Sequence, residues 1–75
     1  METRILIIDD DPFICRQLED LYRAQNYIVD SANDANTALQ RLSEHDYSLV
    51  LVDFKIPGTD GLNLTKEIRE RWPDI

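Results

Sequence analysis

The chain has 75 residues, enough for one small domain. A domain of this size buries only about 60% of the surface that its unfolded chain exposes, so its core is small. The net charge of −7 disfavours direct contact with nucleic acid or with an anionic membrane surface. The single cysteine excludes an internal disulfide bond and fits a cytoplasmic location. No apolar stretch reaches the roughly 18 residues of a membrane span.

A strand and then a helix are predicted for the first third of the chain. Residues 4–8 form an apolar run without alternation, which is typical of a strand buried on both faces of a parallel sheet. Asp11 can cap a helix of about 12–25, with Pro12 at its first position. The apolar spacing predicts that this helix buries Ile14, Leu18, Leu21, Tyr22 and Gln25.

The middle of the chain repeats this order. Residues 27–32 predict a second strand, in which Asp30 is expected on the surface. Asn33 is predicted to cap a second helix that ends near residue 44. A third strand is predicted at 47–53, because its centre is another continuous apolar run.

A turn-rich loop and a third helix follow. Residues 56–61 combine Pro, Gly and Asp, and Asp60 can cap a helix of about 61–71 that Pro73 stops. Strands alternating with helices indicate an α/β fold with parallel strands. Because an apolar edge strand invites pairing, we expect self-association through the exposed edge of the third strand.

Two of the predicted strands run directly into aspartates. Asp9, Asp10 and Asp11 follow the first strand, and Asp53 ends the third. Open α/β sheets bind ligands at the carboxyl ends of their strands. Carboxylates this close stay ionised together only when a cation joins them, so Asp9, Asp10 and Asp53 predict a site for a divalent metal and a phosphoryl group. Asp11 is better explained as a helix cap than as a ligand.

The segments around these aspartates resemble the two hallmark segments of bacterial response-regulator receiver domains. They are residues 5–12, ILIIDDDP, and residues 49–61, LVLVDFKIPGTDG. The resemblance covers essentially all of the chain. It implies an incomplete flavodoxin-like receiver fold with strand order 2-1-3 and three helices. Residues 1–75 would be the N-terminal part of a single receiver domain, truncated after the third helix.

The resemblance also implies a function and the residues that perform it. Asp53 would accept a phosphoryl group from a histidine kinase or phosphotransfer protein. Asp9, Asp10, Asp53 and the backbone carbonyl of Lys55 would hold Mg²⁺, and Gly61 would help to shape the loop before the third helix. Such a domain is a phospho-acceptor in signalling rather than an enzyme.

Two alternatives stay open. The family's Ser or Thr after a fourth strand and its Lys after a fifth have no counterpart in these residues, which favours a non-switching module for dimerisation or partner docking. A hydrolase of haloacid-dehalogenase type also uses an aspartate at a strand end. Its Asp-x-Asp motif continues with Thr or Val, whereas this chain continues with Pro12 and Phe13.

Overall fold

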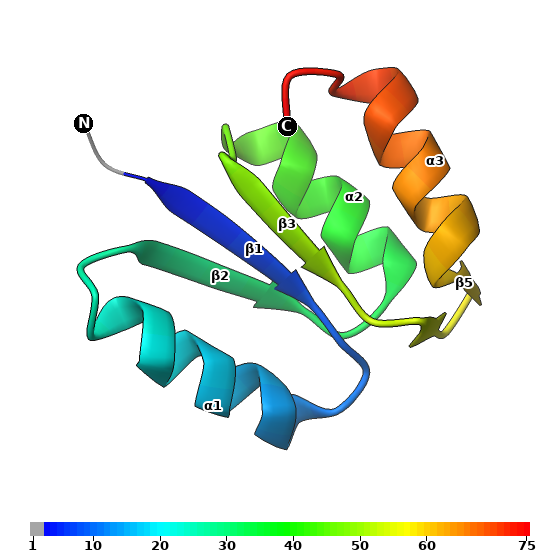
Figure 1. Ribbon diagram of the computed structural model, residues 1–75. Helices are drawn as coiled ribbons and strands as arrows, with labels where there is room; N and C mark the ends of the chain where they lie inside the picture. The colour runs from blue at the N-terminus through cyan, green and yellow to red at the C-terminus, as the bar shows by residue number, and fades with distance from the viewer. Residues whose placement is uncertain (1–2) are drawn as a thin grey trace.

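The computed structural model describes residues 3–75, along which strands and helices alternate (Figure 1). The main strands are β1 (Arg4–Ile8), β2 (Ile28–Ala32) and β3 (Leu49–Val52). The helices are α1 (Pro12–Arg23), α2 (Ala35–Glu44) and α3 (Gly61–Arg71). Two short strands, β4 (Lys55–Ile56) and β5 (Thr59–Asp60), pair antiparallel within the predicted loop. The predicted α/β class is confirmed.

β1 is the central strand of a parallel sheet with the order β2-β1-β3. Ile8, its last residue, lies opposite Ala32 of β2 on one side and Val52 of β3 on the other. The carboxyl ends of all three strands therefore meet at one end of the sheet, where the arrowheads lie in Figure 1. This order confirms the prediction, and β3 has one neighbouring strand within residues 3–75.

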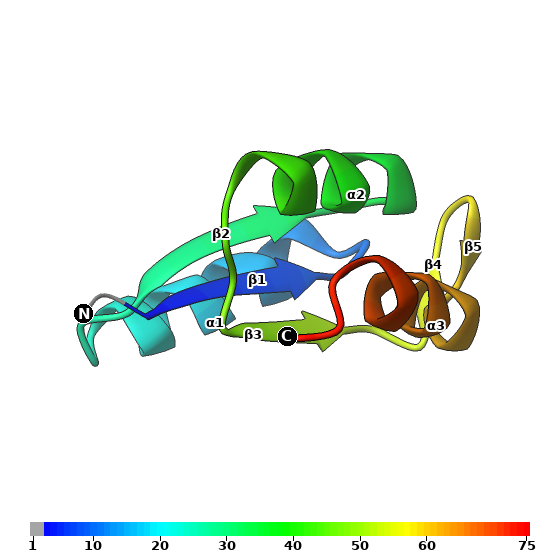
Figure 2. The same cartoon turned by 90° about the horizontal axis from the view of Figure 1, so that it is seen from above.

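The side chains of β1 alternate between two apolar layers. Leu6 and Ile8 pack with residues of α2 and α3, whereas Ile5 and Ile7 pack with residues of α1. All four are at most 2% exposed. Figure 2 shows the strand order from above, with α1 partly hidden beneath the sheet. Because helices cover both faces, β1 needs apolar residues at every position, each contributing roughly 1.5–3 kcal/mol by burial.

The ends of several elements differ slightly from the prediction. α1 ends at Arg23 rather than at residue 25, because Asn26 takes a left-handed backbone conformation with a φ of 70°. β3 spans Leu49–Val52 rather than 47–53, since the flanking residues belong to the loops on either side. None of the helices in residues 3–75 is long and apolar enough to cross a membrane.

The buried face of α1 was predicted incorrectly. Ile14, Leu21 and Gln25 are exposed, and Cys15 is the buried residue of this helix. The Cys15 thiol contacts the backbone at the end of β1, which turns this residue toward the sheet and turns Ile14 away from it. Leu18 and Tyr22 pack beside Cys15 as partly buried residues.

An aspartate caps each of the three helices. Asp11 and Asp60 cap α1 and α3 as predicted. The prediction that Asn33 caps α2 is wrong, because Asp34 Oδ1 accepts a hydrogen bond from the Thr37 N–H at 2.7 Å. This leaves the side chain of Asn33 free to contact the loop after β1.

A polar cluster links β1 and β2 to the segment just before β3. The Asp30 carboxylate accepts one hydrogen bond from the Arg4 guanidinium at 2.8 Å and one from the Tyr47 hydroxyl at 2.6 Å. Asp30 is thus half-buried, and its predicted surface position is wrong. Burial acts to raise the pKa of Asp30, but the hydrogen bonds from Tyr47 and Arg4 hold this pKa below its usual value.

Replacing Tyr47 by Phe removes one hydrogen bond from this carboxylate. We expect Tyr47→Phe to lower the free energy of unfolding by about 1–2 kcal/mol at neutral pH. The lowered pKa of Asp30 stabilises the fold above the unfolded value of 3.8, and this contribution is lost as the pH falls from there through the folded pKa. The difference between Tyr47→Phe and the unmodified chain should therefore shrink on acidification.

Urea unfolding over a pH series measures both effects. Tyr27→Phe is the matched control, because the Tyr27 ring lies beside Tyr22 and the hydrogen bonds to the Asp30 carboxylate come from Arg4 and Tyr47. An equal loss of stability in both variants, or a difference that does not change with pH, would contradict the role given to the cluster.

Candidate functional site

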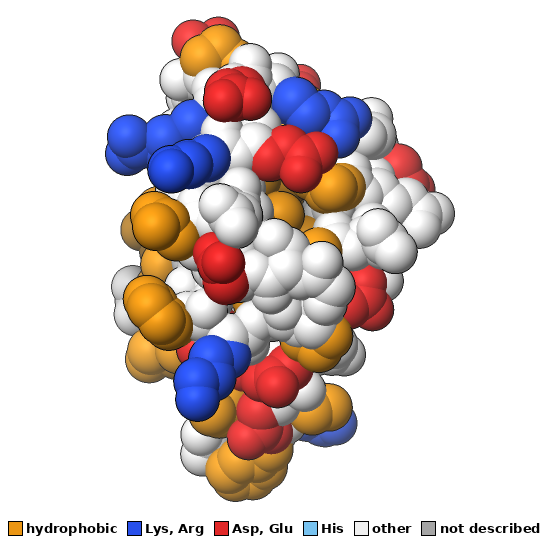
Figure 3. All heavy atoms as spheres, turned by 90° about the vertical axis from the view of Figure 1, so that its right-hand side faces the viewer, with side chains coloured by type: hydrophobic (Ala, Val, Ile, Leu, Met, Phe, Trp, Pro, Cys, Tyr) orange, Lys and Arg blue, Asp and Glu red, His pale blue; other side chains and the backbone are white. Residues whose placement is uncertain are grey.

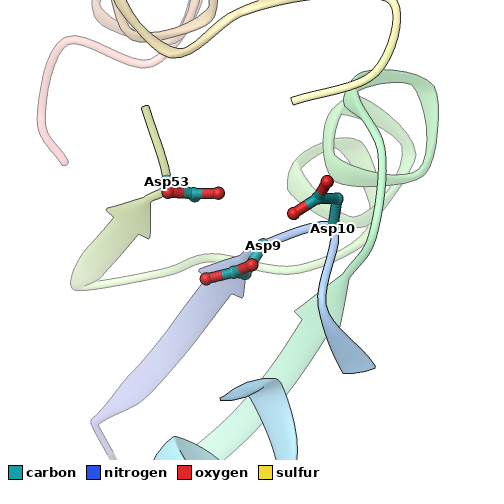
Figure 4. A group of neighbouring side chains, drawn as sticks. All are labelled: Asp9, Asp10 and Asp53. Atoms are coloured by element: carbon teal, nitrogen blue, oxygen red, sulfur yellow. The ribbon is translucent and has the colours of Figure 1, made fainter. Parts of the chain in front are cut away.

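Three aspartates meet at the carboxyl ends of β1 and β3 (Figure 4). One carboxylate oxygen from each of Asp9, Asp10 and Asp53 lies within 4.8 Å of the other two. Figure 4 shows the three carboxylates turned toward one another. They meet because Ile8 and Val52 are paired, so the residues that follow them leave the sheet as neighbours. The structure thus brings together the three carboxylates that the sequence singled out.

Backbone hydrogen bonds orient two of these carboxylates. Asp9 Oδ1 accepts a hydrogen bond from the Asp11 N–H at 2.9 Å. Asp53 Oδ1 accepts one from the Phe54 N–H at 2.8 Å. The Asp53 N–H in turn donates to the Ile8 carbonyl at 2.8 Å. Each bond uses one lone pair of Oδ1, so each carboxylate keeps further lone pairs on both oxygens for a ligand.

The electrostatics of the site favour a bound cation. Burial raises the pKa of Asp9, the hydrogen bond from Asp11 opposes the rise, and the charges of Asp53 and Asp10 add to it. A divalent cation reverses this effect by favouring the charged carboxylates. Carboxylate oxygens are also the ligands that Mg²⁺ and Ca²⁺ prefer. The residues present therefore fit a hard divalent cation.

Lys55 borders a hollow that Asp10 of the acidic site also lines. It begins β4, its side chain is exposed, and it pairs with Asp60 of β5. Together with Asp10 and Phe54 it lines a hollow of about 350 Å³. Lys55 and Asp10 thus border the same hollow, and the role of the Lys55 carbonyl as a metal ligand stays a prediction.

Exposed hydrophobic side chains lie beside the acidic site. Phe54 and Leu62 are 78% and 60% exposed, and both line a second hollow with Asp53. In the space-filling view of Figure 3, hydrophobic and acidic side chains are mixed over the lower part of this side of the molecule, with Lys or Arg side chains among them. A partner that reaches Asp53 therefore meets apolar surface as well as charge.

Gly61 allows the first turn of α3 to lie against the backbone of Asp53. A Cβ at this position would lie 2.4 Å from the carbonyl oxygen of Asp53 and 3.0 Å from the Cα of Phe54. The Gly61 N–H donates to the Phe54 carbonyl at 2.9 Å. A residue without a side chain is needed here because two segments of backbone approach closely.

Asn33 contacts this region, although the sequence predicted it as the cap of α2. Its side-chain amide donates to the Asp9 carbonyl at 2.8 Å. An asparagine just after a strand and before a helix is also typical of a helix cap. Its neighbour Asp34 is an equally good cap, so the pattern alone could not decide which of the two turns toward the site.

Residues 5–75 match the family described as response regulator receiver domain. The chain belongs to the response regulator receiver family. Among curated relatives, this receiver is 39% identical over 70 residues to the transcriptional regulatory protein ResD of Bacillus subtilis. It is also 39% identical over 72 residues to the aerobic respiration control protein ArcA of Escherichia coli. The matches cover 93% and 95% of this chain but only 29% and 30% of the length of those relatives.

Solved structures show the same receiver fold. The response regulator TrrA of Thermotoga maritima, solved in complex with Mg²⁺-BeF, matches with a TM-score of 0.89 and 35% identity, over 96% of this chain and 63% of its own. TrrA has also been solved in complex with the histidine kinase ThkA. A CheY-like receiver domain from Methanospirillum hungatei matches with a TM-score of 0.93 and 29% identity, over 97% of this chain and 58% of its own. The flavodoxin-like, CheY-like fold is confirmed for the residues described.

Replacing Gly61 by Ala tests the close approach beneath Asp53. The added Cβ forces the Asp53 carbonyl to move, so we expect Gly61→Ala to lower the free energy of unfolding by about 1–3 kcal/mol. It should also shift the amide resonances of Asp53 and Phe54 in a ¹⁵N–¹H spectrum.

Gly58→Ala is the matched control. Gly58 has a φ of 92°, so alanine is strained there, but its Cβ would meet only the Ala35 Cβ, at 4.0 Å. We expect a loss of about 1–2 kcal/mol from this strain, with the Asp53 resonance unmoved. An unmoved Asp53 resonance in Gly61→Ala would show that the site does not depend on this glycine.

Proposed function

We propose that this receiver accepts a phosphoryl group on Asp53 in a Mg²⁺-dependent reaction. The observation that carries the proposal is the meeting of Asp9, Asp10 and Asp53 within 4.8 Å at the carboxyl ends of paired strands. The donor would be a histidine kinase or a phosphotransfer protein. The solved complex of TrrA with the kinase ThkA supports this class of partner.

Asp53 is the carboxylate best placed to act as the nucleophile. It lines a hollow beside the exposed side chains of Phe54 and Leu62, whereas burial and neighbouring charges raise the pKa of Asp9. In the transfer, Asp53 Oδ2 attacks phosphorus and the bond from phosphorus to the donor imidazole nitrogen breaks. The electron pair of that bond stays on the nitrogen, and the imidazole leaves with a proton taken from water. The product is an acyl phosphate on Asp53. The Phe54 N–H donates to Oδ1 at 2.8 Å, which leaves Oδ2 as the attacking oxygen in this proposal.

The metal would be held by Asp9, Asp10 and Asp53 and by the backbone carbonyl of Lys55. When bound, Mg²⁺ supplies positive charge that offsets both the carboxylates and the phosphoryl oxygens. The Mg²⁺-BeF complex of TrrA supports this choice of ion. The chain itself positions the carboxylates, because the strand pairing and the Asp11 N–H hold them in place before the donor binds.

On this proposal, residues 1–75 are the N-terminal part of one receiver domain of a cytoplasmic signalling protein. The domain is itself modified and turns over no substrate of its own. The chain spans under a third of the length of ResD and ArcA. The proposal therefore concerns the phosphorylation of this domain and not the activity of the whole protein.

Asp53→Asn tests the acceptor directly. Native mass spectrometry of the chain with Mg²⁺ and a small acyl-phosphate donor should show one phosphoryl adduct. We expect Asp53→Asn to abolish the adduct, because an amide oxygen is a far weaker nucleophile than a carboxylate. We expect Asp10→Ala to remove the dependence on Mg²⁺.

Asp46→Asn is the matched control, since Asp46 is exposed and lies outside the acidic group. It should retain the adduct at the level of the unmodified chain. An adduct that persists in Asp53→Asn, or one that forms equally well with a chelator present, would contradict the proposal.

The free edge of β3 favours a second candidate function, association with a second copy of this chain. β3 has one partner strand within the described residues, and its other edge offers unpaired backbone groups. A hollow of about 370 Å³ beside this edge is lined mainly by apolar residues, namely Leu49, Val50, Val52, Thr65, Ile68, Arg69 and Ile75. Two copies related by a twofold axis could pair these edges antiparallel.

Leu49→Lys tests this association. Leu49 is 43% exposed at the start of β3, and a lysine there places charge on the apolar edge. We expect sedimentation velocity to show a self-associating chain and Leu49→Lys to shift it toward monomer by about tenfold in dissociation constant. Salt should strengthen association, because each copy carries a net charge of −7.

Leu62→Lys is the matched control, since Leu62 is exposed on α3 and does not line the hollow beside β3. It should associate as the unmodified chain does, with or without Mg²⁺. A compact monomer of the unmodified chain at high concentration would remove this second candidate.

A further inference from the structure

We propose that Asn33 is a positioning residue for the acidic site: its side-chain amide holds the Asp9 carbonyl and thereby fixes the place of the Asp10 carboxylate. This inference rests on the proposed function, because it concerns the metal affinity of the same site. It assigns a role to a residue that touches neither the metal nor the phosphoryl group.

The backbone of Asp9 is held from both sides. Its N–H donates to the Ala32 carbonyl at 3.0 Å, which extends the pairing of β1 with β2 by one bond. Its carbonyl then accepts from the Asn33 Nδ2 at 2.8 Å and lies 3.5 Å from the Cys15 Sγ. The Asn33 amide thus supplies the next hydrogen bond after the last one between the backbones of β1 and β2. With these bonds in place, the peptide group that joins Asp9 to Asp10 cannot turn freely.

This peptide group determines the direction in which Asp10 leaves the sheet. Asp10 is exposed and lies in neither a strand nor a helix, so local backbone bonds decide where its carboxylate lies. Without the Asn33 amide, the Asp9 carbonyl would keep only the thiol of Cys15, which is a weak donor. Asp10 would then no longer be held against Asp53.

The side chain of Asn33 is itself held in place. Its Nδ2 also lies 3.5 Å from the buried Cys15 Sγ, which anchors it to α1. Because Asp34 caps α2, Asn33 is not needed there. One amide therefore joins the ends of β1 and β2 to the first turn of α1, around the backbone that carries the acidic pair.

The choice of metal ion separates positioning from general stability. Mg²⁺ demands near-octahedral geometry with short bonds, whereas Ca²⁺ tolerates irregular geometry. A displaced Asp10 should therefore weaken Mg²⁺ binding more than Ca²⁺ binding. A loss of folded protein would weaken both equally.

Asn33→Ala is tested by calorimetric titration of the 75-residue chain with each ion. Residues that orient metal ligands typically change metal affinity by about tenfold or more, so we expect the Mg²⁺ dissociation constant to rise about tenfold. The Ca²⁺ constant should rise about threefold or less. Asn36→Ala is the matched control, since Asn36 is exposed in the first turn of α2 and outside the acidic site. It should change neither constant.

Asn33→Asp sharpens the test. The substitution removes the donor but adds a negative charge, which by itself would strengthen cation binding. Positioning predicts weaker Mg²⁺ binding than in the unmodified chain despite the added charge. In the metal-free state, hydrogen exchange of the Asp11 amide should be faster in both Asn33 variants, because Asp9 Oδ1, which accepts the hydrogen bond of this amide, is no longer fixed. The exchange rate should be unchanged in Asn36→Ala.

Three outcomes overturn the inference. They are unchanged Mg²⁺ affinity in Asn33→Ala, an equal loss for Mg²⁺ and Ca²⁺, and Mg²⁺ affinity in Asn33→Asp that equals or exceeds that of the unmodified chain. Each of them leaves the proposed function standing, because the unmodified chain still binds Mg²⁺. An unmodified chain that binds neither ion overturns the proposed function and this inference together.

Discussion

The parallel pairing of β1 with β3 is the constraint on which the rest of the molecule depends. Ile8 and Val52 lie opposite each other, so Asp9, Asp10 and Asp53 leave the sheet side by side. A slip of one residue in this register would turn the apolar side chains of one strand to the opposite face. The buried layers on both faces of β1 therefore hold the register, and the register in turn holds the acidic site.

The acidic site lowers the stability of the fold in one respect. Three carboxylates in close proximity repel one another, and burial raises the pKa of Asp9, a rise to which the neighbouring charges add. Apolar packing of β1 offsets the free-energy cost of this repulsion. Ile8, the residue before Asp9, is only 1% exposed. A divalent cation removes the same repulsion, so metal affinity and the folding free energy are linked.

The sequence was sufficient to predict the three main strands and the acidic group, because apolar runs that end in aspartate carry strong local signals. The strand order came from the resemblance to receiver domains, and the short strands β4 and β5 were not predicted. It was insufficient wherever a side chain had two good partners. Asn33 and Asp34 are both suitable caps, and only the packing of α1 against β1 and β2 turns Asn33 toward Asp9. Asp30 is charged and was expected on the surface, but Arg4 and Tyr47 meet it from the neighbouring segments. Such contacts are set by tertiary structure, which local pattern does not contain.

The most direct test of the account is the position of a bound ion. Mn²⁺ can replace Mg²⁺ at oxygen sites and scatters anomalously, so crystals grown with Mn²⁺ would locate it. The account predicts a single anomalous peak at about 2.0–2.3 Å from oxygens of the Asp9, Asp10 and Asp53 group, bridged in part by water. A peak elsewhere on the chain, or no peak at the carboxyl ends of β1 and β3, would contradict the claim that strand pairing builds a metal site.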